Sequence, residues 1–211
     1  VDLANFPEMT YTLESDIDFT RMREIFFADE KFSASGEGKF DGTFHKFEGG
    51  FDLQGTFTSE VAGINAFRFE ELDGQLLWQR DRFQVWEVAA RPYGGQAWWD
   101  FTMEPLGGLL PAQATFEFRY QDVQVGQLLQ ALELPGFRPI AKASGRNFLE
   151  WDLGDFTDFR NEGSIRLDPP EGVRLATDQL PAHLPSEVQD RARRPPDLTT
   201  RDFQLGGELE Y

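Results

Sequence analysis

The stretch from Arg82 to Met103 constrains the fold most, because it holds two runs of alternating apolar and polar residues joined by the turn sequence Arg91-Pro92-Tyr93-Gly94-Gly95. Such alternation is typical of β-strands with one face packed against other residues and one face exposed to solvent. In the second run the apolar side consists of Ala97, Trp99, Phe101 and Met103, and the other side of Trp98, Asp100, Thr102 and Glu104. The first run offers Phe83 and Val85 to the apolar side and places Trp86 and Val88 on the outer side. The stretch therefore predicts a β-hairpin with one covered face.

Alternation of the same kind continues over most of the chain, and 21 Phe residues supply most of its aromatic side chains. Phe has a high β propensity and no polar atom that needs a partner, so we predict a mainly β fold of antiparallel strands. The segments expected to contain strands are Tyr11–Phe19, Lys31–Phe57 as several short strands, Ile64–Leu72, Gln75–Gln79, Ala114–Tyr120, Phe137–Leu153, Asn161–Leu167 and Asp202–Tyr211. Asp73-Gly74 is expected to be the two-residue hairpin turn between Ile64–Leu72 and Gln75–Gln79.

Two segments carry apolar residues at helical spacing, Phe19–Phe27 and Asp122–Leu134. Asp18 is the expected N-cap of the first helix and Asp122 that of the second, because Asp side chains accept hydrogen bonds from the first helical N–H groups. Helices of this length are too short to be stable alone. We therefore expect both to pack their apolar sides against the sheet, near equivalent ends of two units.

The order of these elements predicts two similar units, residues 1–110 and residues 111–211. In each unit a strand and a short helix precede an Ala-Ser-Gly sequence, at Ala34-Ser35-Gly36 and at Ala143-Ser144-Gly145, and an aromatic strand follows. Residues 169–196 depart from the pattern, since they are rich in proline and polar residues, and we interpret them as an insertion.

Composition excludes several classes of function. The formal net charge is -17 with a pI near 4.4, which argues against a nucleic-acid partner because phosphate binding depends on Lys and Arg. The chain has no Cys and 2 His, so we expect no catalytic residues, no metal site and no cofactor. Its longest run without a charged residue, Pro105–Phe116, has twelve residues, fewer than the roughly 20 that a membrane-spanning helix needs.

The apolar side of the strands is the candidate binding surface. Its predicted residues are Phe51, Leu53, Phe57, Phe67, Phe69, Trp78, Phe83, Val85, Trp99, Phe101, Met103, Phe116, Phe118, Leu149 and Trp151. If one strongly curved sheet keeps this face open as a groove, with only the short helices in it, the face would hold acyl chains. If two sheets face each other instead, the same residues form the core of a β-sandwich. Alternation along the sequence is identical in the two cases.

Three kinds of motif occur along the chain: the short helix with its Ala-Ser-Gly strand (Phe19–Phe40 and Asp122–Phe148), the sequence Phe69–Leu76, and Tyr93-Gly94-Gly95 before a strand. Together they resemble the AsmA and TamB superfamily of bacterial envelope proteins. The resemblance covers roughly residues 11–167 and implies a groove-shaped β structure in the periplasm, anchored at its N-terminus in the inner membrane. It also implies phospholipid or another acyl lipid, neighbouring repeats of a longer parent chain and outer-membrane assembly proteins as partners. The Pro-rich segment and the lack of an anchor helix depart from the family's pattern.

The resulting hypothesis is a non-catalytic segment of a lipid-transfer conduit that supports phospholipid transport or outer-membrane assembly. As a segment of a longer sheet, it is expected to have unpaired edge strands near Tyr11–Phe19 and Asp202–Tyr211. Two alternatives stay open. A carbohydrate-binding β-sandwich would use Trp78, Trp86, Trp98, Trp99 and Tyr93 as stacking platforms. A structural spacer or interaction domain would bind neither lipid nor sugar.

Overall fold

The structure is a computed structural model that describes residues 8–28, 30–109, 111–133, 141–156 and 158–168, and the backbone of a short strand at 203–205. The strands are β1 (Met9–Asp18), β2 (Ala34–Phe47), β3 (Gly50–Ile64), β4 (Phe67–Gln79), β5 (Phe83–Arg91), β6 (Gln96–Glu104), β7 (Gln113–Gln124), β8 (Lys142–Asp152), β9 (Phe159–Asp168) and β10 (Phe203–Leu205). The helices are α1 (Phe19–Phe26) and α2 (Val125–Ala131).

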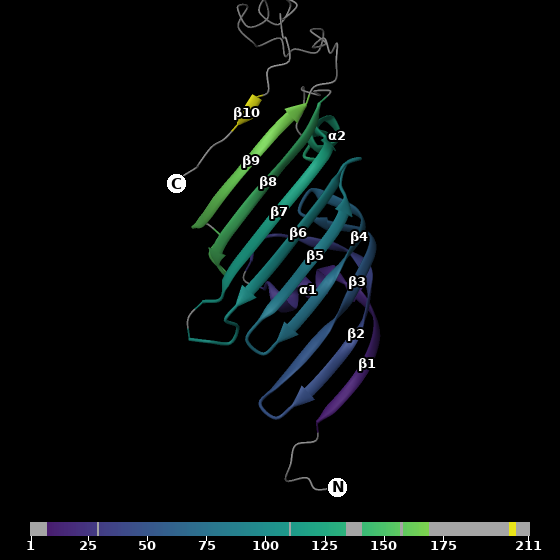
Figure 1. Ribbon diagram of the computed structural model, residues 1–211, viewed down its shortest axis with the longest axis vertical. Helices are drawn as coiled ribbons and strands as arrows, with labels where there is room; N and C mark the ends of the chain where they lie inside the picture. Colours follow the sequence, from purple (N-terminus) through teal and green to yellow (C-terminus); the bar gives the residue numbers. More distant parts are fainter. Residues whose placement is uncertain are drawn as a thin grey trace, which may run out of the picture.

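In the described part of the chain these strands form one ten-stranded sheet, in which each strand pairs antiparallel with its neighbours in sequence (Figure 1). β1 lies at one edge and β10 at the other, so the sheet is open. The predicted mainly β fold, a curved antiparallel sheet with two short helices, is confirmed. The described residues contain no second sheet, so the β-sandwich alternative does not apply to them.

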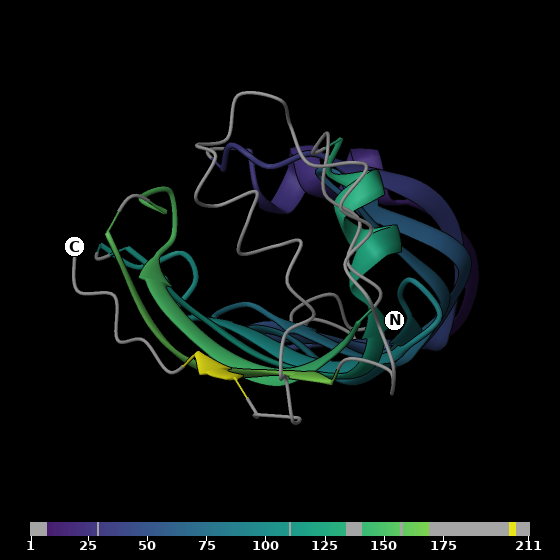
Figure 2. The ribbon, with the colours of Figure 1, turned by 90° about the horizontal axis from the view of Figure 1, so that it is seen from above.

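The sheet bends strongly, and both helices lie on its concave side (Figure 2). Glu71, Glu87 and Asp122 have positive φ angles of 50°, 52° and 57°, and each lies where the register of its strand shifts. Such bulges bend a strand and increase its twist. Two of the N–H groups at the bulges bind a side chain of a neighbouring strand, since Glu87 donates to Asp100 Oδ1 (2.7 Å) and Asp122 to Ser144 Oγ (3.1 Å). We attribute much of the curvature to these three positions.

The hairpin of β5 and β6 confirms the predicted turn and the predicted faces of the second run. Trp98 lies on the convex side and is 39% exposed, whereas Trp99 packs against the core from the concave side. The prediction for Val88 was wrong, because Val88 is fully buried. The bulge at Glu87 adds one residue between Val85 and Val88 and so turns Val88 inward.

The predicted turn at Asp73-Gly74 was also wrong. Both residues lie inside β4, where Gly74 pairs with Phe57, and the turn between β3 and β4 is at Asn65-Ala66. A Cβ atom added to Gly74 would lie 2.8 Å from the Phe57 ring and 2.9 Å from a Val88 methyl group. Gly74 is therefore needed for close packing on the concave face, and it does not adopt the positive φ of a hairpin turn.

Lys31–Phe57 forms fewer and longer strands than predicted. β2 has 14 residues and β3 has 15, and one turn before Gly50 joins them. Asp41-Gly42 lies inside β2, because Gly42 pairs with Gly55 and a Cβ atom at Gly42 would lie 2.3 Å from the backbone oxygen of Gln54. Glycine at these positions again serves packing between strands.

The first helix agrees with its prediction, and the second agrees in part. Asp18 caps α1, since its Oδ1 accepts hydrogen bonds from the N–H groups of Thr20 (2.9 Å) and Arg21 (3.2 Å). α2 begins only at Val125, because Asp122 is the bulge residue of β7 and not a helix cap. Gln124 occupies the N-cap position without a side-chain hydrogen bond to the helix.

The sheet runs without a break across the predicted boundary at residue 110, because β6 and β7 pair along their lengths. The two Ala-Ser-Gly sequences nevertheless occupy similar places, each near the start of a strand that follows a helix. A Cβ atom at Gly36 would lie 2.3 Å from Val61 O, and one at Gly145 would lie 2.3 Å from Ser164 O. The division into two repeats stays a prediction. The Pro-rich segment 169–196 and most of Asp202–Tyr211 lie outside the described residues.

The convex face carries much of the charge. Several strands place an Arg and an acidic residue two positions apart, hence on one side of the sheet: Arg68 with Glu70, Arg119 with Glu117, Arg160 with Glu162 and Arg166 with Asp168. These side chains are at least 40% exposed, so each ion pair contributes little to stability. Their main effect is to keep the convex face hydrated.

Candidate functional site

The pairing of the strands places all of the predicted apolar residues on the concave face. Residues directly opposite each other in an antiparallel ladder share a face. One row across the sheet contains Leu53, Trp78, Phe83, Met103, Ala114 and Trp151, a second contains Leu76, Val85, Phe101, Phe116 and Leu149, and Trp99 with Phe118 begins a third. Phe51 and Phe57 share the face of Leu53 on β3, and Phe67 and Phe69 follow the β4 bulge on the same face.

This face is covered unevenly. Phe57, Phe83 and Met103 are almost completely buried, with 7%, 3% and 1% of their surface exposed. Phe67 is 41% exposed, and the other predicted residues are half-buried. The concave face is therefore neither a uniform open groove nor a uniform core.

Helix α1 covers the part of the face formed by β4, β5 and β6. The Phe26 ring meets the Trp78 ring edge-on at 4.7 Å and lies 5.2 Å from the Phe83 ring, measured between ring centroids. The Phe27 ring lies 5.7 Å from the Phe101 ring. These contacts confirm that α1 packs its apolar side against the sheet.

The described residues of the connection from Phe27 to Ser33, which are all but Asp29 and which we call the strap, extend this cover across the concave face. Glu30 is 5% exposed, and its Oε1 accepts hydrogen bonds from Trp151 Nε1 (3.2 Å) and from the N–H of Gly154 (2.9 Å). These donors belong to the end of β8 and to the β8–β9 turn. The Glu30 carboxylate therefore fixes the strap to the far side of the sheet.

The strap is also held at its other end and along its length. The Ser33 N–H donates to Asn65 Oδ1 (2.9 Å), and the Asn65 N–H donates to Ser33 O (2.9 Å). Arg23 of α1 donates from Nε to Phe32 O (2.8 Å) and from Nη2 to Glu30 O. The strap thus connects the β3–β4 turn with the β8–β9 turn, over the buried part of the face.

A second part of the face lies beyond the strap and carries a series of aromatic rings, which we call the aromatic ladder: Phe69, Trp99, Phe118 and Tyr120. Their successive centroid distances are 5.2, 6.0 and 5.5 Å. Helix α2 lies close to β4 and β7 near this part, and the packing of its apolar side on the sheet stays a prediction. Burial raises the pKa of the Tyr120 hydroxyl, although the Tyr120 side chain is only half-buried.

Beside the ladder, the β3–β4 hairpin exposes apolar side chains. Ile64 and Phe67 pair with each other and are each 41% exposed. The Tyr93 hydroxyl fixes this hairpin, because it donates to Ala66 O (3.3 Å) and accepts from the N–H of Arg68 (3.0 Å). Tyr93 therefore has a structural hydrogen-bonding role at the position where the sequence offered it as a stacking platform.

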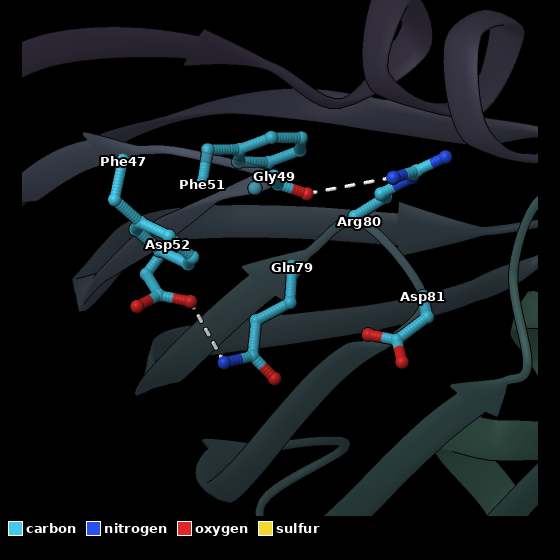
Figure 3. Close-up of a pocket in the computed structure, with 8 residues that line it drawn as sticks. Phe47, Gly49, Phe51, Asp52, Gln79, Arg80 and Asp81 are labelled. Atoms are coloured by element: carbon cyan, nitrogen blue, oxygen red, sulfur yellow. Dashed lines mark hydrogen bonds between the residues drawn. The ribbon is translucent and has the colours of Figure 1, made fainter. Parts of the chain in front are cut away.

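A hollow of about 420 Å³ lies at the opposite end of the sheet, between the β2–β3 and β4–β5 turns (Figure 3). Phe47 and Phe51 line it together with Asp52, Gln79, Arg80 and Asp81. Gln79 donates to Asp52 Oδ1 (2.7 Å), and Arg80 donates to Gly49 O (3.4 Å). Phe51 is the predicted apolar-face residue that lines this hollow, and its ring meets Trp78 edge-on at 5.2 Å. The other walls are largely polar, so the hollow is a poorer match for an acyl chain than the ladder.

Other sequence features give no further site in the described residues. No group of three or more His, Cys, Asp or Glu side chains is arranged to hold a metal ion there. His45 Nε2 lies 2.9 Å from Glu8 Oε1, and His183 lies outside the described residues. Among the helices of the described segments, none has the length and apolar character to cross a membrane. Of the five tryptophans only Trp98 is exposed, so an exposed strip of indole rings for sugars is absent.

Sequence reasoning missed Glu30 and Arg23, which organise the strap. Glu30 stands in a charged stretch that is ordinary for a surface loop, and its partners Trp151 and Gly154 are 121 and 124 positions away. No periodicity within the segment could indicate them. Comparison of the chain with protein families, with characterised proteins and with solved structures found no match.

Proposed function

We propose that this protein is a non-catalytic segment of a periplasmic lipid-transfer conduit, which binds acyl chains on its concave β face and supports phospholipid transport or outer-membrane assembly. The observation that carries the proposal is the aromatic ladder beyond the strap. Phe69, Trp99 and Phe118 are apolar, adjacent and half-buried, and Phe67 beside them is 41% exposed. Apolar side chains grouped in this way on a concave surface are typical of ligand-binding sites.

The physical basis is transfer of methylene groups from water to the aromatic rings. Each methylene removed from water contributes about 0.8 kcal/mol, so contact with even half of a lipid chain offsets much of the cost of association. Binding by apolar contact also needs no reacting group. The periplasmic location and phospholipid as the natural cargo rest on the resemblance to the AsmA and TamB superfamily.

Quenching of tryptophan fluorescence tests the proposal with a matched pair of variants. The probe is a single-chain phospholipid brominated near the middle of its acyl chain, because bromine quenches an indole only at short range. We expect saturable quenching of the full chain, strongly reduced in Trp99→Phe. Trp98→Phe is the control, since Trp98 is the adjacent residue on the convex face.

Two outcomes would contradict acyl binding at the ladder. One is the absence of quenching at probe concentrations up to the micellar limit, and the other is quenching that depends on Trp98 and not on Trp99. Mass spectrometry of lipid extracted from the full chain, purified without detergent, then identifies the natural cargo. A chain that carries no lipid and binds no probe favours the structural spacer.

A further inference from the structure

Within the described part of the chain, strand β1 is an edge strand without the usual protection. It pairs with β2 through ten consecutive residue pairs and has no partner strand on its other side among the described residues. Unpaired N–H and C=O groups at an edge readily accept another strand unless Pro, Lys, a bulge or a covering element blocks them. Residues Met9–Asp18 include no Pro and no Lys, and the β1–β2 register has no shift.

The two faces of β1 differ in character. Tyr11, Leu13, Ser15 and Ile17 share the concave face, because Tyr11 pairs with Phe44, and Leu13 packs with Ile17 against the core. Thr10, Thr12, Glu14 and Asp16 therefore lie on the convex face. Tyr11 is 50% exposed although it belongs to the apolar face, so the edge leaves apolar surface uncovered.

We propose that β1 pairs antiparallel with β1 of a second copy of this chain, about a two-fold axis at Leu13. The inference does not depend on the proposed lipid function. In a continuous sheet, paired residues must lie on the same face, so Met9 faces Ile17, Tyr11 faces Ser15, Thr10 faces Asp16 and Thr12 faces Glu14. Each of these two carboxylates then lies opposite a threonine hydroxyl, which can donate a hydrogen bond to it.

Other registers fit less well. A two-fold axis at Glu14 places the two Glu14 carboxylates opposite each other, and parallel pairing in register brings every carboxylate beside its copy. An axis at Thr12 leaves Ile17 outside the paired region. The axis at Leu13 pairs Met9–Ile17 throughout without opposing like charges, and this self-complementarity identifies a second copy as the occupant.

Two consequences follow from this arrangement. The concave faces of the two copies lie on the same side of one extended sheet, so Tyr11 lies beside Ser15 of the partner, and Phe40 and Phe57 of the partner follow on the same face. Each copy carries a formal net charge of -17, and salt at about 0.15 M screens repulsion beyond about 8 Å. Dimerisation is therefore expected to strengthen as the ionic strength rises.

Cysteine cross-linking tests the register, because the chain has no Cys of its own. Thr12→Cys and Glu14→Cys change exposed residues of the convex face. A mixture of these two variants is expected to form a disulfide-linked dimer under mild oxidation, whereas each variant alone should cross-link at least several-fold more slowly. Leu13→Cys alone should cross-link with itself. Equal rates for all pairs, or no cross-linked dimer, would overturn the proposed register.

Charge substitutions test the interface without cross-linking. Sedimentation equilibrium over a salt series should show Thr12→Lys dimerising more strongly than the unchanged chain, because the new lysine faces Glu14. Thr12→Glu should weaken dimerisation by about tenfold, since two like-charged pairs arise per dimer. Thr56→Lys and Thr56→Glu are matched controls on the exposed side of β3. A monomer at every salt concentration, or equal effects at Thr12 and Thr56, would overturn the proposal.

Discussion

The two helices occupy similar places in the chain, but the parts of the concave face beside them differ. Each helix follows a strand and precedes a strand that begins near an Ala-Ser-Gly sequence. Beside α1, the rings of Phe26 and Phe27 and the strap cover a face in which Phe83 and Met103 are almost completely buried. Beside α2, the aromatic ladder stays half-buried. A short helix alone therefore does not decide whether this face is closed.

The segment that follows the helix makes the difference on the α1 side. The strap reaches both sides of the sheet, through Glu30 at the β8–β9 turn and through Ser33 at the β3–β4 turn. One end depends on a buried carboxylate with two donors and the other on a pair of hydrogen bonds with Asn65. The part of the concave face under the strap is therefore closed by polar contacts at the two ends of the strap and by apolar contacts between them.

The largest expected effect compares core truncations in the two parts. Phe83→Ala should lower the free energy of unfolding by about 3–5 kcal/mol, because Phe83 is 3% exposed and touches Phe26. Phe118→Ala in the ladder should cost clearly less, since Phe118 is half-buried. Urea unfolding followed by circular dichroism measures both values. Equal losses would show that the ladder is as enclosed as the strapped core.

A smaller effect is expected from the rim contact of the strap. Glu30→Ala leaves Trp151 Nε1 and the Gly154 N–H without their acceptor and should cost about 1–3 kcal/mol. It should also speed hydrogen exchange at the Gly154 amide. Glu24→Ala, an exposed change on α1, is the control. Unchanged exchange at Gly154 in Glu30→Ala would mean that the strap is not held there.

The two helices also differ in the hydrogen bonds that their N-cap residues make. Asp18→Ala should destabilise by about 1 kcal/mol, because the Asp18 carboxylate accepts two N–H bonds at the start of α1. Gln124→Ala at the same position of α2 should cost less, because Gln124 makes no such bond. Thermal melting distinguishes them, with Asp41→Ala as a control on the exposed side of β2. Equal shifts in melting temperature would contradict a specific role for the Asp18 cap.

Alternation along the strands predicted the face of most residues correctly but not that of Val88, because the side-chain direction in a strand has a period of two only where no bulge interrupts it. The bulges were not predictable in the same way. Glu71 and Glu87 adopt a left-handed backbone that Glu rarely takes, so their sequences give no signal, and Val88 changes face as a result. The Gly74 position shows the converse, since a strong turn sequence is overridden by packing against Phe57.

Which parts of the concave face are covered was less predictable than which residues form that face. Alternation cannot distinguish an apolar face covered by a strap from one left open, because the residues of the face are the same in both cases. The decisive contact joins Glu30 to Trp151, and these residues are 121 positions apart. A single sequence contains no local pattern that reports such a pairing.

The smallest effect at neutral pH, and the most specific to the ladder, is expected from Tyr120→Phe. Burial raises the pKa of Tyr120 above its ordinary value of 10.0, because the phenolate is poorly solvated in the ladder. At neutral pH the hydroxyl is protonated in both the folded and the unfolded chain, so the shift does not affect the free energy of unfolding. As the pH rises above about 10, the unfolded chain loses this proton first and is favoured, so stability falls until the raised folded pKa is passed.

Tyr120→Phe should therefore reduce the loss of stability above pH 10, whereas the loss that other titrating groups cause should remain. Urea unfolding at pH 7 and at several values between 9 and 11 measures the difference, with Tyr11→Phe as a control because Tyr11 is 50% exposed. An equal loss of stability in Tyr120→Phe and in the unchanged chain would show that the Tyr120 hydroxyl is solvated in the folded chain. It would contradict the burial of Tyr120 in the ladder.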